Sequence, residues 1–169
     1  KDEAWRKTNI SKLPIEELTL AADLKVELSD NPEGVMLVKL NDTDANLKEK
    51  LNTLIPADTD KFSALAAGYT HDGFLLVVPK GMQVEETLEA TISVPPDGTL
   101  QNSHVYVLVE AGASAALHLN FIGADGSKTA MHNGIVEVIV KDNARLHLVQ
   151  RQKLGNETWH FSHEKVSVG

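Results

Sequence analysis

Seven histidines are the side chains of this chain best suited to chemistry, because imidazole titrates near neutral pH and binds metals. His160 and His163 are three residues apart, and on a helix that spacing would place both rings on one face, as a pair of metal ligands requires. The surrounding sequence WHFSHEKVSV is typical of a strand, however, where residues three apart point to opposite sides. We therefore predict no metal site here and expect the histidines to be solvated or partly packed.

Two short runs contain the residue types of catalytic motifs without their geometry. Ser162-His163-Glu164 has the members of a nucleophilic triad, but neighbouring residues of a strand alternate faces and cannot form the required chain of hydrogen bonds. Gly123 to Lys128 has two residues between its glycines where a phosphate-binding Walker loop has four, and no helix follows it. We interpret this second run as a connecting loop.

The remaining charged candidates are interpreted as surface groups. Lys80 stands alone on a turn, where a solubilising charge is expected, and Glu85, Glu86 and Glu89 are expected to form a solvated strand edge. Glu86 also interrupts an apolar alternation, which predicts a bend or bulge. The chain has no cysteine, so disulfides, thiolate metal ligands and cysteine nucleophiles are excluded. The sequence thus predicts no catalytic, cofactor-binding or metal-binding residues, and no enzyme.

Composition indicates a folded β-rich protein. Of the 169 residues 42% are hydrophobic and 24% charged, which is typical of a globular chain. Aromatic residues make up only 5%, so Val, Leu, Ile and Ala must fill the interior, as in stacked strands. The net charge of -8 opposes nucleic-acid binding, and the densest basic group, Arg145 to Lys153, is mixed with apolar residues and does not read as a basic patch.

The sequence also carries expectations about location and completeness. No apolar run approaches the roughly 20 residues of a membrane span, and nothing resembles a signal peptide, so we expect a cytoplasmic protein that does not contact membranes. The chain begins at Lys1 without an initiator methionine and ends after the strand-like KVSVG. We expect it to be a fragment of a longer protein.

The elements that would position any site fall into two parts. Residues 1–70 are predicted to form an α/β segment: a polar helix or arm at the start, a strand at Gly34 to Leu40, and a helix from Asp44 to just before Pro56. A second helix, capped by Asp58 or Thr59, would present one apolar face made by Phe62, Leu65, Ala66 and Tyr69. Residues 71–169 are predicted to contain strands and turns only.

An internal repeat organises the second part. FLLVVPKGMQV, VYVLVEAGASA and VEVIVKDNARL each contain an apolar strand, two linking residues, a Gly or Asn, and an apolar alternation. Gly81, Gly112 and Asn143 occupy the same place at an interval of 31 residues. These are residue types that tolerate positive φ, so each copy is predicted to turn through a left-handed conformation there. Pro79, beside the first turn, would sit where a ladder hydrogen bond is dispensable.

The repeat favours a solenoid of stacked rungs over an unrelated β-sandwich, whose Val-rich strands could align by accident. After each turn the apolar residues should face inward: Met82, Val84, Ala113, Ala115, Leu117, Leu119, Phe121, Ala144, Leu146 and Leu148. His118 and His147 would then face outward at comparable points of successive copies. If they were close in space, each would depress the proton affinity of the other.

Several segments resemble the SufB/SufD family of iron–sulfur cluster assembly scaffold proteins. The resemblance covers about residue 58 to the end, with a fainter match at Ala4 to Asn9, whose Trp-Arg-Lys-Thr-Asn run and the lack of cysteine are closer to SufD than to SufB. The segments that carry it are DKF from Asp60 with AL from Ala64, VPKG from Val78, and EAGA from Glu110. Further along they are HNGIVE from His132, DNARL from Asp142, and the WHF strand from Trp159.

The resemblance implies a right-handed parallel β-helix core, here residues 71–169, preceded by the α/β segment. It implies a non-catalytic scaffold subunit that pairs with a SufB-like paralogue and a SufC-like ATPase, with an iron–sulfur cluster only in the full complex. The family's cluster residues and ATPase-docking helices lie later than this chain extends, so it places no functional residue here. A carbohydrate-active β-helix enzyme is the alternative, which would need clustered carboxylates or stacked basic residues along one outer face, and the sequence offers no such column. An open end of the β-helix would expose unpaired strand edges, so we expect the chain to self-associate.

Overall fold

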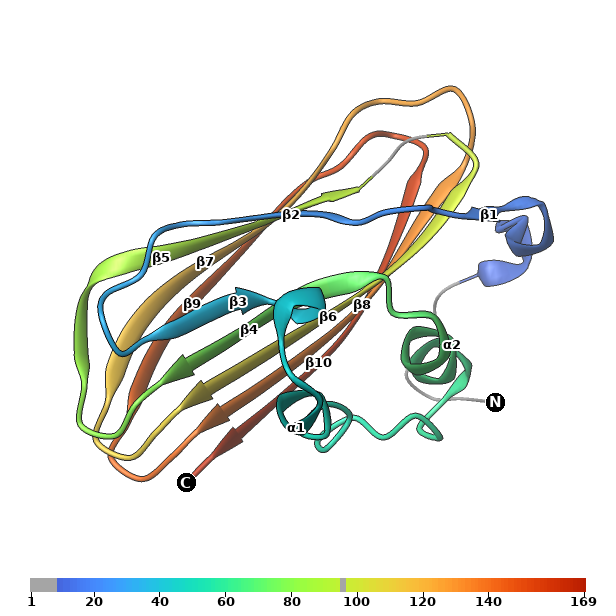
Figure 1. Cartoon of the computed structure of the whole chain (residues 1–169). Coiled ribbons are helices and arrows are strands. Elements are labelled where there is room, and N and C mark those ends of the chain that lie inside the picture. The colour runs from blue at the N-terminus through green and yellow to red at the C-terminus, as the bar shows by residue number, and fades with distance from the viewer. Residues whose placement is uncertain (1–8, 95–96) are drawn as a thin grey trace.

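The computed structural model describes residues 9–94 and 97–169 (Figure 1). The predicted N-terminal helix or arm and most of the Ala4 to Asn9 match fall on residues 1–8, outside the described residues. Between Asn9 and Glu17 the chain forms two single turns of 3-10 helix, Ile10–Lys12 and Ile15–Glu17.

Most of the described chain is a parallel β-solenoid of about three turns. One sheet stacks β4 (Asp72–Val78), β6 (Thr99–Val109), β8 (Ala130–Val140) and β10 (Thr158–Val168) in parallel. The other stacks β5 (Gln83–Val94), β7 (Ser114–Gly123) and β9 (Arg145–Lys153), also in parallel. The chain alternates between the two sheets, so each rung pairs with the next (Figure 1). The prediction of a mainly β parallel β-helix is confirmed, and the β-sandwich alternative is wrong.

Three short N-terminal strands join the two sheets. β3 (Met36–Lys39) pairs antiparallel with β4, and β2 (Lys25–Leu28) pairs antiparallel with β5, so both strands cover the edge of the first rung. β1 (Thr19–Leu20) adds two parallel pairs to β6. Covered edges cannot template further pairing, whereas β9 and β10 each have a neighbouring strand on one side only among the described residues. β3 was predicted; β2 was not, since KVEL is too short and polar to stand out.

The repeated turn has the conformation that the sequence predicts. Gly81, Gly112 and Asn143 have φ values of 74°, 69° and 56°, and their turns stack through hydrogen bonds such as the one from Gly112 N to Asp142 O at 2.9 Å. In the second and third copies the residue after the strand donates to the rung before it, as Glu110 N does to Val78 O at 3.0 Å. Pro79 holds this place in the first copy, where no earlier rung needs a donor.

Aliphatic side chains fill the space between the two sheets, as the alternation predicts. The buried inward residues include Phe74, Leu76, Val78, Leu88, Ile92, Val105, Val107, Leu117, Leu119, Phe121, Val136 and Val138. The alternation is interrupted where expected, because the β5–β7 register shifts between Gln83 and Thr87, confirming the bulge at Glu86. Burying one such side chain contributes about 1.5–3 kcal/mol, so the stacked rungs account for most of the fold's hydrophobic stabilisation.

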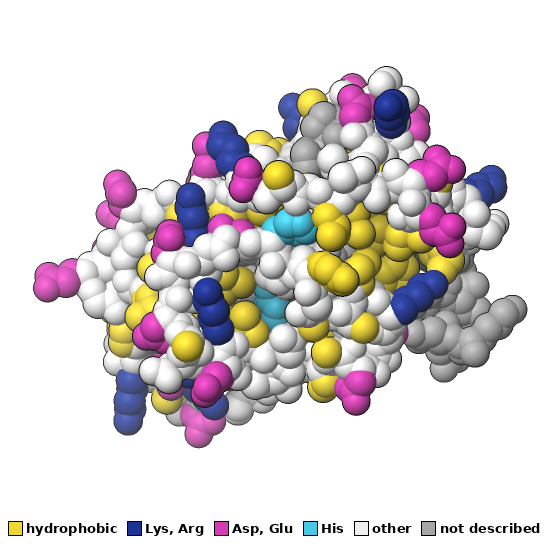
Figure 2. All heavy atoms as spheres, turned by 45° about the vertical axis from the view of Figure 1, so that its right-hand side comes forward, with side chains coloured by type: hydrophobic (Ala, Val, Ile, Leu, Met, Phe, Trp, Pro, Cys, Tyr) yellow, Lys and Arg dark blue, Asp and Glu magenta, His cyan; other side chains and the backbone are white. Residues whose placement is uncertain are grey.

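The outer face of the β4–β6–β8–β10 sheet is covered by the N-terminal segment. α2 (Lys61–Tyr69) begins at the N-cap Asp60, whose side chain accepts from Phe62 N and Ser63 N. Its apolar face packs on the sheet through clusters that contain Phe62, Leu100, Met131 and Phe161, and Ile55, Ala66 and Ile135. Figure 2 shows hydrophobic side chains gathered on the side of the molecule that carries these N-terminal helices.

Two helix predictions need correction. α1 (Ala45–Lys48) is one turn long, because the backbone N–H groups of Asn52, Leu54 and Ile55 bond to the Glu137 carboxylate and so leave helical geometry. α2 is capped by Asp60 rather than by Asp58 or Thr59, and Tyr69 is 57% exposed instead of joining its apolar face. The domain boundary at residue 70 stays a prediction, since β2 and β3 precede it and yet are integral to the two sheets.

Candidate functional site

A chain of hydrogen-bonded polar side chains runs through the otherwise apolar interior. Ser103, His132 and His160 lie on β6, β8 and β10, where His132 and His160 are paired positions. Ser103 Oγ is 2.9 Å from His132 Nε2, and His132 Nδ1 is 2.9 Å from His160 Nδ1. The two imidazoles are stacked at an interplanar angle of 5°, and the ring of Phe121 packs against both. The repeat places them because inward positions recur on adjacent rungs.

The surroundings of His132 and His160 keep both imidazoles neutral. Burial lowers the pKa of His132 well below its ordinary value, and the neighbouring His160 lowers it further. Burial lowers the pKa of His160 as well, with the Glu164 carboxylate opposing the shift. The Nε2 atom of His160 is buried and has no hydrogen-bond partner among the described residues. The two imidazoles can therefore share a proton, and His160 offers one further ring nitrogen.

The last two strands, β9 and β10, carry more polar groups toward the interior than the strands stacked before them. Gln150 pairs with Leu119, and its buried Oε1 lacks a partner within the described part of the chain. Ser162 and Glu164 share the inward parity of His160, and Ser162 Oγ donates to Glu164 Oε1 at 2.9 Å. Gln150 and Glu164 stand where the preceding strands have Leu119 and Val136, so the interior becomes more polar toward β9 and β10.

A second polar pair fastens the N-terminal segment to the outer face of the same sheet. His104 and Glu137 are fully buried, with Nε2 and Oε2 2.8 Å apart. The carboxylate also accepts from Asn52 N, Leu54 N and Ile55 N at 2.6–2.9 Å. Burial raises the pKa of Glu137, but the hydrogen bonds from His104 and the two backbone donors Ile55 and Leu54 outweigh it and leave the pKa lowered. This arrangement holds a loop in place and has no access to solvent.

The histidine pairs weighed from the sequence lie as follows. His160 and His163 do point to opposite sides: His160 joins the interior chain, and His163 Nε2 lies 3.0 Å from Asp60 Oδ2 at the start of α2. His118 and His147 are both on the outer face, but His147 is paired with Ala116 and His118 with Val149. His118 Nδ1 is instead 3.7 Å from Glu89 Oε1.

The other candidate motifs also take non-catalytic places. Ser162-His163-Glu164 is split between the two faces of β10, so it cannot act as a triad. Residues 124–129 connect β7 to β8, and the backbone N–H groups of Ser127 and Lys128 are bonded to Asp97 Oδ1. Lys80 and the three glutamates of β5 are exposed. Glu89 is followed across the sheet by His118 and Val149, so no column of carboxylates forms.

One basic feature was misjudged from the sequence. In β9 the strand alternation directs Leu146 and Leu148 inward and Arg145, His147, Arg151 and Lys153 outward. The mixture of basic and apolar residues is therefore separated by the fold into an exposed basic row on the outer face of the sheet. The charge remains local, because the whole chain carries -8.

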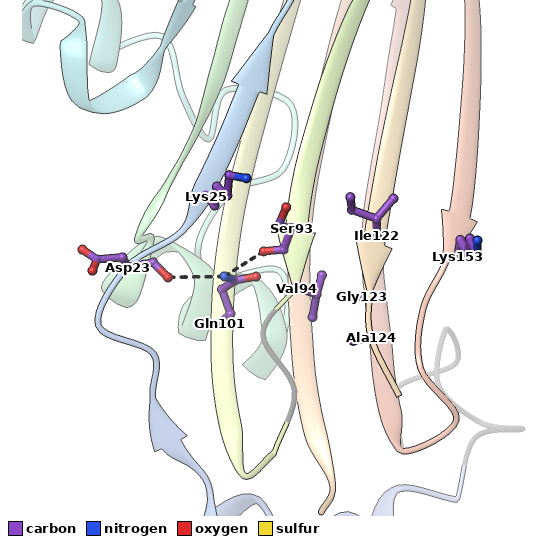
Figure 3. Close-up of a pocket in the computed structure, with 9 residues that line it drawn as sticks. All are labelled: Asp23, Lys25, Ser93, Val94, Gln101, Ile122, Gly123, Ala124 and Lys153. Carbon is purple, nitrogen blue, oxygen red and sulfur yellow. Dashed lines mark hydrogen bonds between the residues drawn. The ribbon is translucent and has the colours of Figure 1, made fainter. Parts of the chain in front are cut away.

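An open groove of about 630 Å³ lies on the β2–β5–β7–β9 sheet, where β5, β7 and β9 end (Figure 3). Val94, Ile122 and Ala124 form its apolar floor, and Lys25 and Lys153 stand on its rim. Gln101 lies beneath it, fully buried, and donates from Nε2 to Ser93 O at 3.3 Å and to Asp23 O at 3.5 Å. These bonds tie β2 to β5 and so fix two walls of the groove.

The described residues show neither a metal cluster nor a membrane span. Within residues 9–94 and 97–169, no three His, Asp or Glu side chains come together as ligands for an ion. Over the same ranges no helix is long and apolar enough to cross a bilayer.

This geometry defines the class of protein as a short parallel β-solenoid preceded by an α/β segment. Residues 92–169, which hold the second and third rungs, match the family model described as SUF system FeS cluster assembly, SufBD core domain. Residues 92–169 therefore carry a SufBD core domain, as the sequence segments predict.

Relatives of both kinds within the family are similar to this chain. A SufBD family protein of Staphylococcus saprophyticus is 24% identical over 86% of this chain and 32% of its own length. SufD of Bacillus subtilis is 34% identical over 53% of the chain and 21% of its own length, and SufB of the same organism is 25% identical over 73% and 28%. The chain thus spans about a third or less of the length of these relatives.

Proposed function

We propose that this chain is part of a non-catalytic scaffold subunit in a SufBCD-type iron–sulfur cluster assembly complex. The observation that carries the proposal is that the SufBD core match at residues 92–169 falls on the stacked parallel strands β6 to β10. A stack of this kind supplies a rigid body on which other proteins can assemble. The family relationship supports cluster assembly as the process, and the scaffold role is inferred from the solenoid.

The absence of catalysis is part of the same proposal. The polar groups of the described interior are paired with one another or buried, and Glu137 is consumed by four hydrogen bonds that hold a loop. We infer that nucleotide hydrolysis is supplied by a SufC-like ATPase and that an iron–sulfur cluster forms only in the complete complex. The proposed site of action is the cytoplasm.

The proposed assignment within the family is to the SufD side. The higher identity to SufD than to SufB supports it, although the two comparisons cover different shares of the chain. The Trp-Arg-Lys-Thr-Asn run and the absence of cysteine favour the same side. The physiological partner would then be a SufB-like paralogue.

The test is affinity purification of the full-length protein that contains this sequence, tagged in its host. We expect a SufB-like protein and an ATPase to co-purify in constant proportion and to stay together on size-exclusion chromatography. An isolated protein, or one that co-purifies with neither, would contradict the proposal. Measuring ATP hydrolysis with and without the tagged subunit then separates a scaffold from a catalyst, since the subunit alone should hydrolyse nothing.

A further inference from the structure

The groove of Figure 3 has a charge pattern that none of the functions above uses. A single row crosses the outer face of the β2–β5–β7–β9 sheet, in which Lys25 is paired with Ser93, Ser93 with Ile122, and Ile122 with Lys153. Two cations therefore stand at the ends of one row, with a small polar and an apolar side chain between them. Figure 3 shows all four along the groove, and the carboxylate of Asp23 turned away from it.

Ile122 differs in type from the other outward residues of β7. The other outward residues of β7 are small or polar: Ser114, Ala116, His118 and Asn120. Ile122 alone is a large aliphatic side chain, and 38% of it is exposed. Together with Val94 and Ala124 it gives the groove a floor that water solvates poorly, which is the usual composition of a binding groove.

The rim lysines are accessible for binding. The Lys25 side chain is 67% exposed, and its ion pair with Glu27 at 2.9 Å is also solvated, so it is worth little and can be shared. Lys153 is exposed at the other end, and Arg151 follows two residues earlier on the same outer face of β9. The groove is thus a local positive site on a molecule whose net charge is -8.

We propose that this groove binds an extended acidic segment of a protein partner, with acidic side chains at positions i and i+4 and an aliphatic side chain at i+2. Strands in a sheet are about 4.8 Å apart, so Lys25 and Lys153 are separated by three spacings, or about 14 Å. An extended peptide rises about 3.3 Å per residue, so side chains four apart are about 13 Å apart and lie on the same side. The side chain midway between them faces the apolar floor.

The dimensions and charges favour this occupant over a nucleic acid. A polynucleotide presents a continuous row of phosphates, and the acidic remainder of this chain would repel it outside the groove. Two cations that flank an apolar floor match two separated carboxylates and one hydrocarbon side chain. The β2–β5 ladder fixes the distance between Lys25 and Ser93, and the Gln101 carboxamide holds the residue before β2 beside it through Asp23 O and Ser93 O.

The binding test uses the 169-residue chain and the pentapeptide Glu-Ala-Val-Ala-Glu-amide, labelled with fluorescein on its N-terminal amine, and measures fluorescence anisotropy. We expect saturable binding below about 1 mM that weakens with added NaCl, because exposed charge pairs are screened. The same peptide with Gln at both ends should bind at least tenfold more weakly. Equal binding of the two peptides, absence of saturation, or tighter binding of an oligothymidylate of equal charge would overturn the proposal.

Exposed-residue variants locate the site without threatening the fold. Lys25→Gln, Lys153→Gln and Ile122→Ser should each weaken binding of the acidic peptide by roughly fivefold or more. Lys80→Gln is the matched control, since it removes one exposed lysine at the turn before β5, the end of that strand away from the groove. Unchanged circular dichroism of all four shows that folding is intact. Equal affinity of the Lys25, Lys153 and Lys80 variants would refute the groove as the binding site.

Discussion

His104 and Glu137 are joined diagonally across neighbouring strands. The register pairs His104 with Ile135 and Glu137 with Tyr106, so the imidazole and the carboxylate are two positions out of register, yet Nε2 and Oε2 are 2.8 Å apart. The diagonal contact leaves the rest of the carboxylate free to accept the backbone N–H groups of the loop at residues 52–55. One buried charge therefore connects two rungs to the N-terminal segment.

Removing the Glu137 carboxylate should be costly. We expect Glu137→Ala to lower the free energy of unfolding by about 3–5 kcal/mol, because it leaves buried donors unpaired. Urea denaturation measures the loss, and hydrogen exchange should accelerate selectively at the amides of Asn52, Leu54 and Ile55. Glu86→Ala, at an exposed position of the β5 bulge, is the control and should change stability by no more than about 0.5 kcal/mol. Unaltered exchange in the loop would show that other contacts hold it.

The imidazole pair predicts that stability falls in mild acid. The folded-state pKa values of His132 and His160 are lowered, so the unfolded chain binds more protons than the folded chain below the unfolded pKa of about 6.5. Their contribution is complete above that pH and is lost as the pH falls toward the folded pKa, with a slope of at most about 1.4 kcal/mol per pH unit for each histidine. Urea midpoints between pH 7.5 and about pH 5 measure the slope.

Variants assign this slope to the interior pair. His132→Gln should flatten the pH dependence of stability, whereas His147→Gln, which changes an exposed histidine on the outer face, should leave it as in the parent chain. If the parent and the His132 variant had the same slope, the pair would not be the source. Glu137 contributes separately at lower pH: its lowered pKa gives stability that is present above about pH 4.5 and lost as the carboxylate is protonated.

Two glycines should respond in opposite directions to alanine. A Cβ at Gly73 would collide with the backbone carbonyl of His104 on the adjacent strand, so Gly73→Ala should destabilise the fold by about 3 kcal/mol or more. Gly68 lies on the exposed side of α2 with no atom near its Cβ position. Gly68→Ala should stabilise by about 0.5–1 kcal/mol, since alanine favours the helix. Thermal unfolding ranks the two, and a reversed order would contradict the strand spacing described here.

The repeated turn can be tested at its centre. Gly112 has φ of 69° and only ordinary contact around its Cβ position, the nearest atom being Gly81 Cα at 3.9 Å. Gly112→Ala should therefore cost about 1–2 kcal/mol through backbone strain alone. Asn143→Gly, at the equivalent place in the next copy, should be tolerated without loss. Denaturation midpoints compare them; an Ala variant as stable as the parent would argue against a left-handed turn.

The free edges of β9 and β10 should lead to self-association of this chain. Val166 and Val168 are 58% and 73% exposed beside these edges, so apolar surface and unpaired backbone groups lie together. Light scattering across a concentration series should show the mean mass rising above that of a monomer. A constant monomeric mass at high concentration would count against this expectation.

The rungs can be predicted from residue types and spacing alone. Gly81, Gly112 and Asn143 mark the turns because positive φ is a property of a single residue, and the inward alternation follows from the two-residue period of a strand. These two local rules predict the stack of rungs, the inward residues, the bulge at Glu86, and the separation of His160 from His163, while the parallel β-helix came from the family resemblance.

Only the tertiary structure decided which polar groups meet. Glu137 takes its donors from residues more than 80 positions earlier, which shortened the helix predicted after Asp44. The basic row of β9 and the groove between Lys25 and Lys153 likewise require the registers of four strands, one of them the unpredicted β2. A local pattern reveals backbone conformation and burial, whereas contacts between distant segments depend on the summed packing of the whole chain.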